Sequence, residues 1–252
     1  MSAILVTQNV TKRFGGLAAT RDVSLALLRG QVHAVLGPNG AGKSTLINLL
    51  SGDLPVTSGT ILYNGRDITR MAPDHRSRLG IGRSYQKTNI FGAFSAFENC
   101  RLAAQSRAPR AWRFLSNATA HAPTSELAAS ALRDAGLAEC GPQAAATLSH
   151  GEQRQLEIAM VLATRPEVLL LDEPLAGMGA DEAQRMIELL RRLREHHAIL
   201  LVEHDMDAVF ALADVITVMV NGQVLESGTP AAIRASPTVR EAYLGSELDI
   251  LQ

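Results

Sequence analysis

The chain has 252 residues, 46% of them apolar, and a formal net charge of −1. This length and composition predict one large domain, or a domain with a subdomain, around a substantial core. The balanced charge argues against a protein that binds nucleic acid through bulk positive charge. Cys100 and Cys140, the two cysteines, have no CxxC spacing, which argues against a disulfide or zinc framework and favours a reducing compartment. With no signal-peptide pattern, and apolar runs far below the roughly 18 residues that span a bilayer, we expect a cytoplasmic protein that reaches a membrane only through partners.

Strand patterns dominate the first part of the chain. Val23, Leu25 and Leu27 alternate with their neighbours, and after Gly30 a short apolar run over 32–36 predicts a second strand. Further on, the pair Asn64-Gly65 stands between strand-like flanks, which is a strong signal for a β-hairpin.

The loop after the 32–36 run reads GPNGAGKST and fits the pattern GxxxxGK[ST]. Its glycines let successive N–H groups point at phosphate oxygens, and the following helix adds the positive end of its dipole. Lys43 can reach the β- and γ-phosphates, and the Ser44 hydroxyl can ligate Mg²⁺. A surface turn with one lysine is the alternative, but the strand before and the helix pattern after favour a nucleotide site. The residues expected to bind the nucleotide are Gly37, Pro38, Asn39, Gly40, Ala41, Gly42, Lys43, Ser44 and Thr45.

The middle of the chain, roughly residues 95–165, is rich in Ala, Leu and Glu and predicts helices with a loop near 107–124. The core is then built from both ends of the chain. We expect one domain over 1–252, with a core over about 1–87 and 161–252 and a helical subdomain over about 88–160.

A second buried-type strand, VLLLD, ends in an acidic pair. Asp172 falls at its carboxyl end, where open parallel sheets bind ligands, and is placed to hold Mg²⁺. Glu173 follows and can act on a water that attacks the γ-phosphate. A solvent-exposed acidic pair is the alternative interpretation of this stretch.

The rest of the chain alternates helix and strand. Residues 180–197 predict a helix with Met186, Ile187, Leu190 and Leu193 on one face, and AILLVEHD predicts another buried strand. VITVMVNGQVLESG predicts a second Asn-Gly hairpin. The order of elements therefore predicts an α/β fold with a mostly parallel sheet.

The stretch LSHGEQ precedes the acidic strand and resembles the signature motif of ATP-binding cassette (ABC) ATPases. Members of that family pair head to tail, and each signature faces the ATP on the partner's P-loop. The resemblance makes Ser149 and Gly151 ligands of the opposite γ-phosphate, with a glycine that permits close approach. A simple capping box of Ser149 and Glu152 is the structural alternative. The expected signature residues are Leu148, Ser149, His150, Gly151 and Glu152.

The same resemblance assigns further roles. Gln86 stands where the family has a glutamine that contacts Mg²⁺ and water and reports to the membrane partner, so the implied metal ligands are Ser44, Gln86 and Asp172. His204 matches the family's switch histidine, so the implied catalytic residues are Glu173, His204 and Gln86. Phe14 matches the aromatic residue that stacks on adenine, with a core phenylalanine as the alternative. The family fold is a P-loop NTPase core with an antiparallel β subdomain and a helical insertion.

The sequence departs from the family pattern at three places. His150 replaces the first of two adjacent glycines, Glu152 stands where Gln is common, and Gly179 stands where many members carry an aspartate that contacts the opposite P-loop. No cross-dimer aspartate is therefore assigned.

Several stretches, among them FGGLAA, GIGRSYQKTNIF and the carboxyl-terminal TPAAIRASPTVREAYLG, are similar to ATP-binding subunits of importers for branched-chain and other hydrophobic amino acids. Relatives in this branch handle amides, urea and aromatic acids. The resemblance implies an ATPase that uses ATP and Mg²⁺, pairs with itself or a paralogue, and works with permease subunits and, through them, a periplasmic solute-binding protein. It would lie on the inner face of the cell membrane, with no nucleic-acid partner. The alternative is a non-transport ABC ATPase, such as one for iron–sulfur cluster assembly.

Two aromatic stretches suggest contact surfaces. Phe91, Phe94 and Phe97 lie within seven residues and predict either a groove for a short permease helix or packing inside the helical subdomain. Arg107, Arg110 and Arg113 surround Trp112, a pattern that fits either a solvated loop or contact with lipid headgroups or a partner.

Overall fold

The computed structural model describes residues 3–85, 89–106 and 122–244. Its centre is a six-stranded sheet in the order β10-β9-β3-β8-β7-β6, in which only β10 runs antiparallel to its neighbour. β3, β7 and β8 are buried along their whole length, which explains why their sequences are continuous apolar runs. The strands are β3 (Val32–Leu36), β6 (Ile81–Arg83), β7 (Val168–Asp172), β8 (Ala198–Val202), β9 (Val215–Val220) and β10 (Gln223–Gly228). The predicted mostly parallel sheet is confirmed.

A second, antiparallel sheet has the order β2-β1-β4-β5. It contains β1 (Ala3–Phe14), β2 (Leu17–Leu28), β4 (Ser58–Tyr63) and β5 (Arg66–Asp67). Both predicted hairpins are present. Their turns have positive φ at both central residues, 49° and 77° at Asn64-Gly65 and 50° and 78° at Asn221-Gly222, as a type I′ turn requires.

Helices cover both faces of the six-stranded sheet. On one face, α1 (Lys43–Ser51) packs between the two sheets, in a buried cluster that includes Val168 and Leu170 of β7. On the other face, α5 (His150–Leu162) and α6 (Ala180–Leu193) share a cluster with Leu169 and Leu171 of the same strand. Alternate side chains of one strand therefore serve two different helix layers. The predicted apolar face of α6 is buried: Met186, Ile187, Leu190 and Leu193, joined by Leu189.

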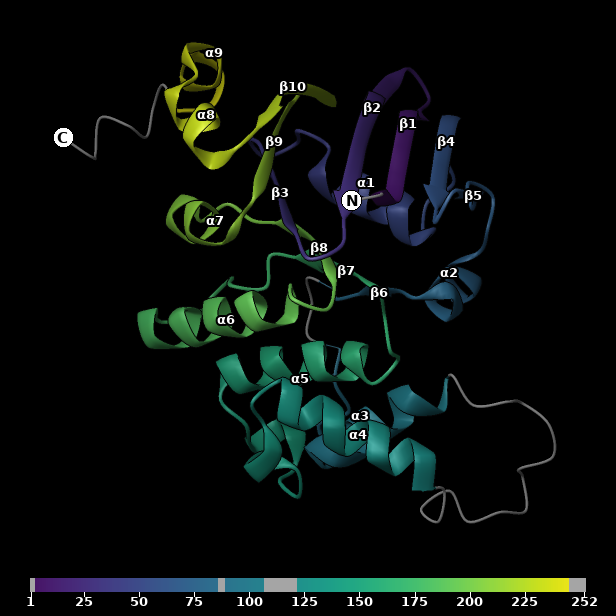
Figure 1. Ribbon diagram of the computed structural model, residues 1–252, viewed down its shortest axis with the longest axis vertical. Coiled ribbons are helices and arrows are strands. Elements are labelled where there is room, and N and C mark those ends of the chain that lie inside the picture. Colours follow the sequence, from purple (N-terminus) through teal and green to yellow (C-terminus); the bar gives the residue numbers. More distant parts are fainter. Residues whose placement is uncertain (1–2, 86–88, 107–121, 245–252) are drawn as a thin grey trace.

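Figure 1 shows α3 (Ala96–Gln105), α4 (Ala122–Asp134) and α5 gathered at the end of the molecule opposite the antiparallel sheet, with α6 between them and the six strands. The helices expected in the middle of the chain are thus present, while the limits predicted for the subdomain stay a prediction. The remaining helices are α2 (Pro73–Leu79), α7 (Met206–Leu212), α8 (Pro230–Ala235) and α9 (Pro237–Val239). Short single-turn helical segments lie at Ala138–Cys140, Ala145–Thr147 and Arg240–Leu244. Among the described residues, no helix is both long and apolar enough to cross a membrane.

Candidate functional site

The Gly-rich loop joins the end of β3 to the start of α1. Gly42 has φ of 99°, and a Cβ there would stand 2.4 Å from the Ala19 carbonyl oxygen, so only glycine fits this turn. Lys43, the first residue of α1, is buried, and its Nζ donates to the carbonyl oxygens of Gly37 at 2.6 Å and Pro38 at 3.1 Å. Burial lowers the pKa of Lys43, while Glu173 and Asp172 raise it. The ammonium group therefore sits inside the loop, near two acidic groups of β7.

Asp172 is the last residue of β7, and Glu173 follows the strand. Asp172 is 4% exposed, and burial raises the pKa of its carboxyl. Its Oδ1 is buried without a hydrogen-bond partner among the residues that the structure describes. Glu173 has φ of 50°, and its N–H donates to the Val202 carbonyl at 2.9 Å. A buried carboxylate oxygen with no donor suits a cation, so this chemistry fits a metal ligand.

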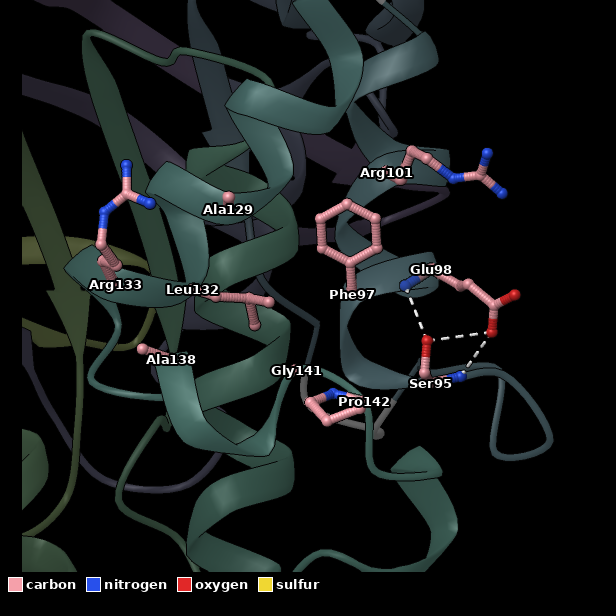
Figure 2. A pocket seen from close by; sticks show the side chains of 10 residues that line it. All are labelled: Ser95, Phe97, Glu98, Arg101, Ala129, Leu132, Arg133, Ala138, Gly141 and Pro142. Atoms are coloured by element: carbon pink, nitrogen blue, oxygen red, sulfur yellow. Dashed lines mark hydrogen bonds between the residues drawn. The ribbon is translucent and has the colours of Figure 1, made fainter. Parts of the chain in front are cut away.

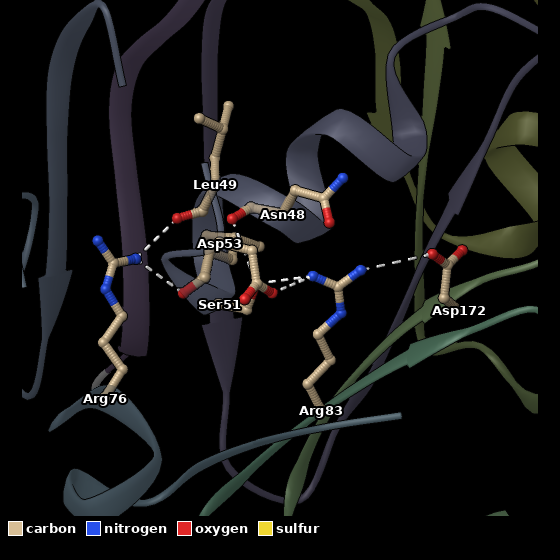
Figure 3. Close-up of polar contacts among 8 residues, drawn as sticks. Asn48, Leu49, Ser51, Asp53, Arg76, Arg83 and Asp172 are labelled. Carbon is tan, nitrogen blue, oxygen red and sulfur yellow. Dashed lines mark hydrogen bonds and ion pairs between the residues drawn. The ribbon is translucent and has the colours of Figure 1, made fainter. Parts of the chain in front are cut away.

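Arg83, at the end of β6, links this acid to the far end of α1. Its Nη1 bonds Ser51 Oγ at 2.8 Å and Asp53 Oδ2 at 2.5 Å, and its Nη2 lies 3.9 Å from Asp172 Oδ2, as Figure 3 shows. The guanidinium also lies over the Tyr85 ring, 4.7 Å from its centroid. Sequence reasoning missed Arg83, because its partners are 30 or more residues away and no local pattern marks it.

Arg76 supports the same helix from another side. Its Nη1 donates to the carbonyls of Leu49 at 2.7 Å and Leu50 at 2.8 Å, in the last turn of α1 (Figure 3). The side chain is 1% exposed, and its remaining nitrogens reach the Met71 and Thr69 carbonyls. Arg76 therefore satisfies carbonyls that the end of a helix leaves without an internal partner.

His204 follows β8 and lies near Glu173. Its Nδ1 is 3.8 Å from Glu173 Oε1 and 3.8 Å from Glu203 Oε2, and its side chain is 61% exposed. Glu203 is fully buried; its Oε1 accepts from the Leu175 N–H at 2.8 Å and its Oε2 from the His204 N–H at 3.1 Å. Burial raises the pKa of Glu203. No local pattern marks this link between the loops after β7 and β8.

The signature stretch begins α5. Ser149 is its N-cap: Ser149 Oγ accepts from the Glu152 N–H at 3.3 Å, and Glu152 Oε2 accepts from the Ser149 N–H at 2.8 Å. The capping box, which was the structural alternative, is thus present. His150 Nε2 lies 3.2 Å from the Ala176 carbonyl oxygen, so this departure from the family pattern contacts the loop after β7. The Gly151 N–H donates to Glu182 Oε1 at 3.1 Å, a partner that sequence reasoning missed.

The P-loop and the signature of one chain begin helices on opposite faces of the six-stranded sheet. α1 packs with one set of alternating side chains of β7 and α5 with the other. Lys43, Asp172, Glu173 and His204, in contrast, all lie at the carboxyl ends of β3, β7 and β8. The structure therefore brings together residues predicted to act on the ATP bound by the same chain. Ser149 and Gly151 lie in the helix layer on the other face of the sheet.

Several predicted residues fall elsewhere. Gln86 and the Arg-Trp cluster around Trp112 lie outside the described residues. Phe14 is 49% exposed, with Lys12 Nζ 5.0 Å from its ring centroid, which excludes the core alternative. Phe91 and Phe94 are also exposed and stack with ring centroids 5.5 Å apart.

Phe97 differs from the other two phenylalanines, because it packs against the core cluster. It also lines a pocket of about 780 Å³ between α3 and α4 (Figure 2). The packing interpretation therefore holds for Phe97 and fails for Phe91 and Phe94.

A glycine loop between a buried strand and a helix, with a buried lysine and an aspartate at the carboxyl end of another strand of the same sheet, defines the P-loop nucleotide-binding class. The family model described as ABC transporter matches residues 20–176, and the model described as branched-chain amino acid ATP-binding cassette transporter matches residues 223–249. The chain belongs to the ABC transporter family, and its expected class, an ABC ATPase, is confirmed.

Relatives match over almost the full length. The chain is 38% identical to the high-affinity branched-chain amino acid transport ATP-binding protein LivG of Salmonella typhimurium (strain LT2), covering 96% of this chain and 98% of the relative. It is 39% identical to BraF of Pseudomonas aeruginosa, with the same coverage. A nucleotide-free ATP-binding cassette of an ABC transporter superposes with a TM-score of 0.86 at 28% identity, covering 96% of this chain and 99% of that one. A cassette in its ADP conformation superposes with a TM-score of 0.85 at 29% identity, covering 98% and 100%. The predicted ABC ATPase fold is confirmed.

Proposed function

We propose that this chain is the ATP-hydrolysing subunit of a membrane importer for branched-chain or other hydrophobic amino acids, or for related small solutes such as amides, urea and aromatic acids. The observation that carries the proposal is the match of residues 223–249 to the branched-chain transporter model. That segment lies outside every nucleotide motif, so it separates this branch from a non-transport ABC ATPase. The LivG and BraF relatives, which match over nearly the whole chain, support the same choice.

At the nucleotide's own side, the P-loop amides and Lys43 hold the phosphates. Phosphate oxygens are stronger acceptors than the Gly37 and Pro38 carbonyls that Lys43 contacts, so the ammonium group exchanges partners when ATP arrives. Ser44, Asp172 and Gln86 would hold Mg²⁺, whose charge would offset that of the phosphates. Asp172 Oδ1, which has no hydrogen-bond partner within the described part of the chain, supports this assignment. Phe14, exposed at the end of β1, stacks on the adenine.

Hydrolysis needs a group that takes a proton from water. Glu173 does this, and His204, 3.8 Å from its carboxylate, steadies the γ-phosphate. The buried Glu203 holds the backbone of both loops and is a positioning residue. Ser149 and Gly151 complete the site of a second subunit, either another copy or a paralogue. Their location across the sheet from their own P-loop supports this pairing.

Permease subunits dock on the exposed pair Phe91 and Phe94. Large exposed aromatics that stack on each other in a chain with only six Phe favour a recognition surface over chance exposure. Closure moves the helical subdomain against the core, and Gln86, at the predicted junction, transmits the motion. The subunit would thus lie on the inner face of the membrane.

The test is to tag this chain, extract it from native membranes in mild detergent, and identify what co-purifies in stoichiometric amounts. We expect multi-span hydrophobic subunits. Recovery from the cytosol alone, or with soluble partners only, would overturn the transport proposal and favour the non-transport ATPase.

A variant pair sharpens that experiment. Phe94→Asp should lower the recovery of permease subunits roughly tenfold, in the range expected for a central interface aromatic, and leave the ATPase rate of the isolated chain unchanged. Leu225→Asp, at a similarly exposed leucine on β10, is the matched control and should recover permease normally. Equal recovery for the two variants would remove Phe94 from the docking surface.

A further inference from the structure

Glu182, in the first turn of α6, contacts the first turn of a different helix. Its Oε1 accepts from the Gly151 N–H at 3.1 Å, and its Oε2 lies 3.4 Å from the Gly179 nitrogen at the start of its own helix. The Ser149 side chain also lowers the pKa of this carboxyl. One carboxylate therefore joins the amino-terminal ends of α5 and α6.

The contact also fills the space beside Gly151. Its backbone is ordinary helix, so no unusual φ requires glycine there. A Cβ at this position would instead stand 2.7 Å from Glu182 Oε1 and 2.8 Å from Cδ. Within the described chain, the group that approaches Gly151 closely is therefore Glu182.

Glu182 is also an anion in its own environment. The hydrogen bond from the Gly151 N–H is the main cause that lowers the pKa of this carboxyl, and the Gly179 N–H and the Ser149 side chain act in the same direction. Glu152 faces the same helix end, but it bonds the Ser149 N–H and leaves the Gly151 N–H to Glu182.

We propose that Glu182 is an internal substitute for the γ-phosphate: it holds the Gly151 N–H until the triphosphate of the opposite subunit displaces it. This inference rests on the proposed pairing of two subunits. The two anions compete because both need the same N–H and repel each other. Glu182 can release Gly151 and keep its contact with Gly179 in α6.

With Glu182 in this role, two subunits pair stably only when the opposite P-loop holds a triphosphate. A diphosphate on the opposite P-loop has no γ-phosphate to take over the Gly151 N–H, so Glu182 stays in place. Only ATP then offers a group that replaces the lost contact. Glu182 therefore favours separated subunits, both after hydrolysis and before ATP binds.

The test uses the full chain carrying Glu173→Gln, in which ATP should be bound and not hydrolysed. Sedimentation measures the ATP concentration that gives half-maximal dimer for this parent and for the parent with Glu182→Ala, Glu182→Gln or Glu188→Gln. We expect Glu182→Ala to need roughly tenfold less ATP, because a charged competitor is removed. Glu182→Gln keeps the acceptor but not the charge and should shift the midpoint less, in the same direction. Glu188 is an exposed carboxylate on the same helix that bonds Gln184, and its variant should match the parent.

The outcomes separate the two proposals. A parent that dimerises with ATP, together with Glu182 variants that need as much ATP or more, overturns the substitute and makes Glu182 a brace between α5 and α6. A parent that stays monomeric at every ATP concentration overturns the pairing and this inference with it. Binding of fluorescent ATP to the monomer checks the fold of each variant, and if Glu182→Ala fails that check, the isosteric Glu182→Gln decides.

Discussion

The amino-terminal ends of α1 and α5 use the same chemistry in opposite ways. Both have N–H groups without a partner inside the helix, and both carry the positive end of a helix dipole. α1 begins with Gly42, has no side-chain cap and has no acidic residue in its first turn. α5 begins with Ser149 in a capping box, has Glu152 in its first turn, and receives Glu182 from α6. One end is kept open for an anion, and the other is already occupied by anions of its own chain.

The comparison shows how the fold stabilises a helix whose amino-terminal end has no side-chain cap. A glycine in place of a side-chain cap at a helix start typically costs only a few tenths of a kcal/mol of stability. α1 offsets such a cost at its other end, where Arg76 binds the carbonyls of its last turn, and through burial of Leu46, Ile47, Leu49 and Leu50. In α5, Glu182 and Ser149 Oγ already accept from the Gly151 and Glu152 N–H groups before any nucleotide arrives.

The largest effect is expected from Glu173→Gln, which removes the proton acceptor beside the open end. Steady-state ATP hydrolysis should fall roughly 10²- to 10⁴-fold, the usual contribution of a positioned base. ATP binding should persist, because the amide keeps the size of the side chain. Undiminished hydrolysis in a phosphate-release assay would refute the role of Glu173.

Arg76→Ala tests how strongly the contacts at the carboxyl-terminal end of α1 stabilise a helix that has no side-chain cap at its amino-terminal end. The substitution leaves buried carbonyls without donors, and each hydrogen bond to a charged group contributes about 1.5–3 kcal/mol, so we expect the free energy of unfolding to fall by about 3 kcal/mol. Urea unfolding measures the change. Arg78→Ala, on the same helix, is the control, because its ion pair with Asp74 (3.3 Å) is on the surface and should contribute under about 1 kcal/mol. If the free energy of unfolding fell equally in the two variants, the contacts of Arg76 with α1 would contribute no more than a surface ion pair.

Lys43→Ala removes the cation from the open end. The affinity for ATP should fall roughly 10- to 100-fold, since a hydrogen bond between two charged groups is lost in a buried site. Titration with fluorescent ATP gives the affinity, and Arg192→Ala, in the exposed last turn of α6, should bind as the unchanged chain does. Unaltered ATP affinity in the Lys43 variant would place the phosphates elsewhere.

The smallest effect concerns the occupied end. Gly151→Ala gains about 1 kcal/mol of helix propensity, but its Cβ displaces the Glu182 carboxylate and loses that hydrogen bond. The two effects oppose each other, so we expect little net change in the free energy of unfolding. In a chain that already carries Glu182→Ala, the same substitution should stabilise by about 1 kcal/mol. Equal changes in both backgrounds, measured by urea unfolding, would show that residues 151 and 182 are not coupled.

Local sequence patterns are enough to predict the main helices and strands and the P-loop end of the nucleotide site. The hairpins at Asn64-Gly65 and Asn221-Gly222, the P-loop between β3 and α1, and Asp172 at the end of β7 are all encoded within a few residues of chain. The capping box of Ser149 and Glu152 is equally local. Such features are predictable because turn chemistry, helix capping and apolar periodicity act between near neighbours.

The polar contacts between distant parts of the chain depend on the tertiary packing. Glu182 is 31 residues from Gly151, Glu203 is 28 from Leu175, and Arg83 is 30 from Asp53. No spacing rule links such pairs, because each contact depends on which helix packs on which face of the sheet. The sequence identified Gly151 as a position of close approach. Only the packing of α6 against α5 decided that a carboxylate of the same chain fills that space.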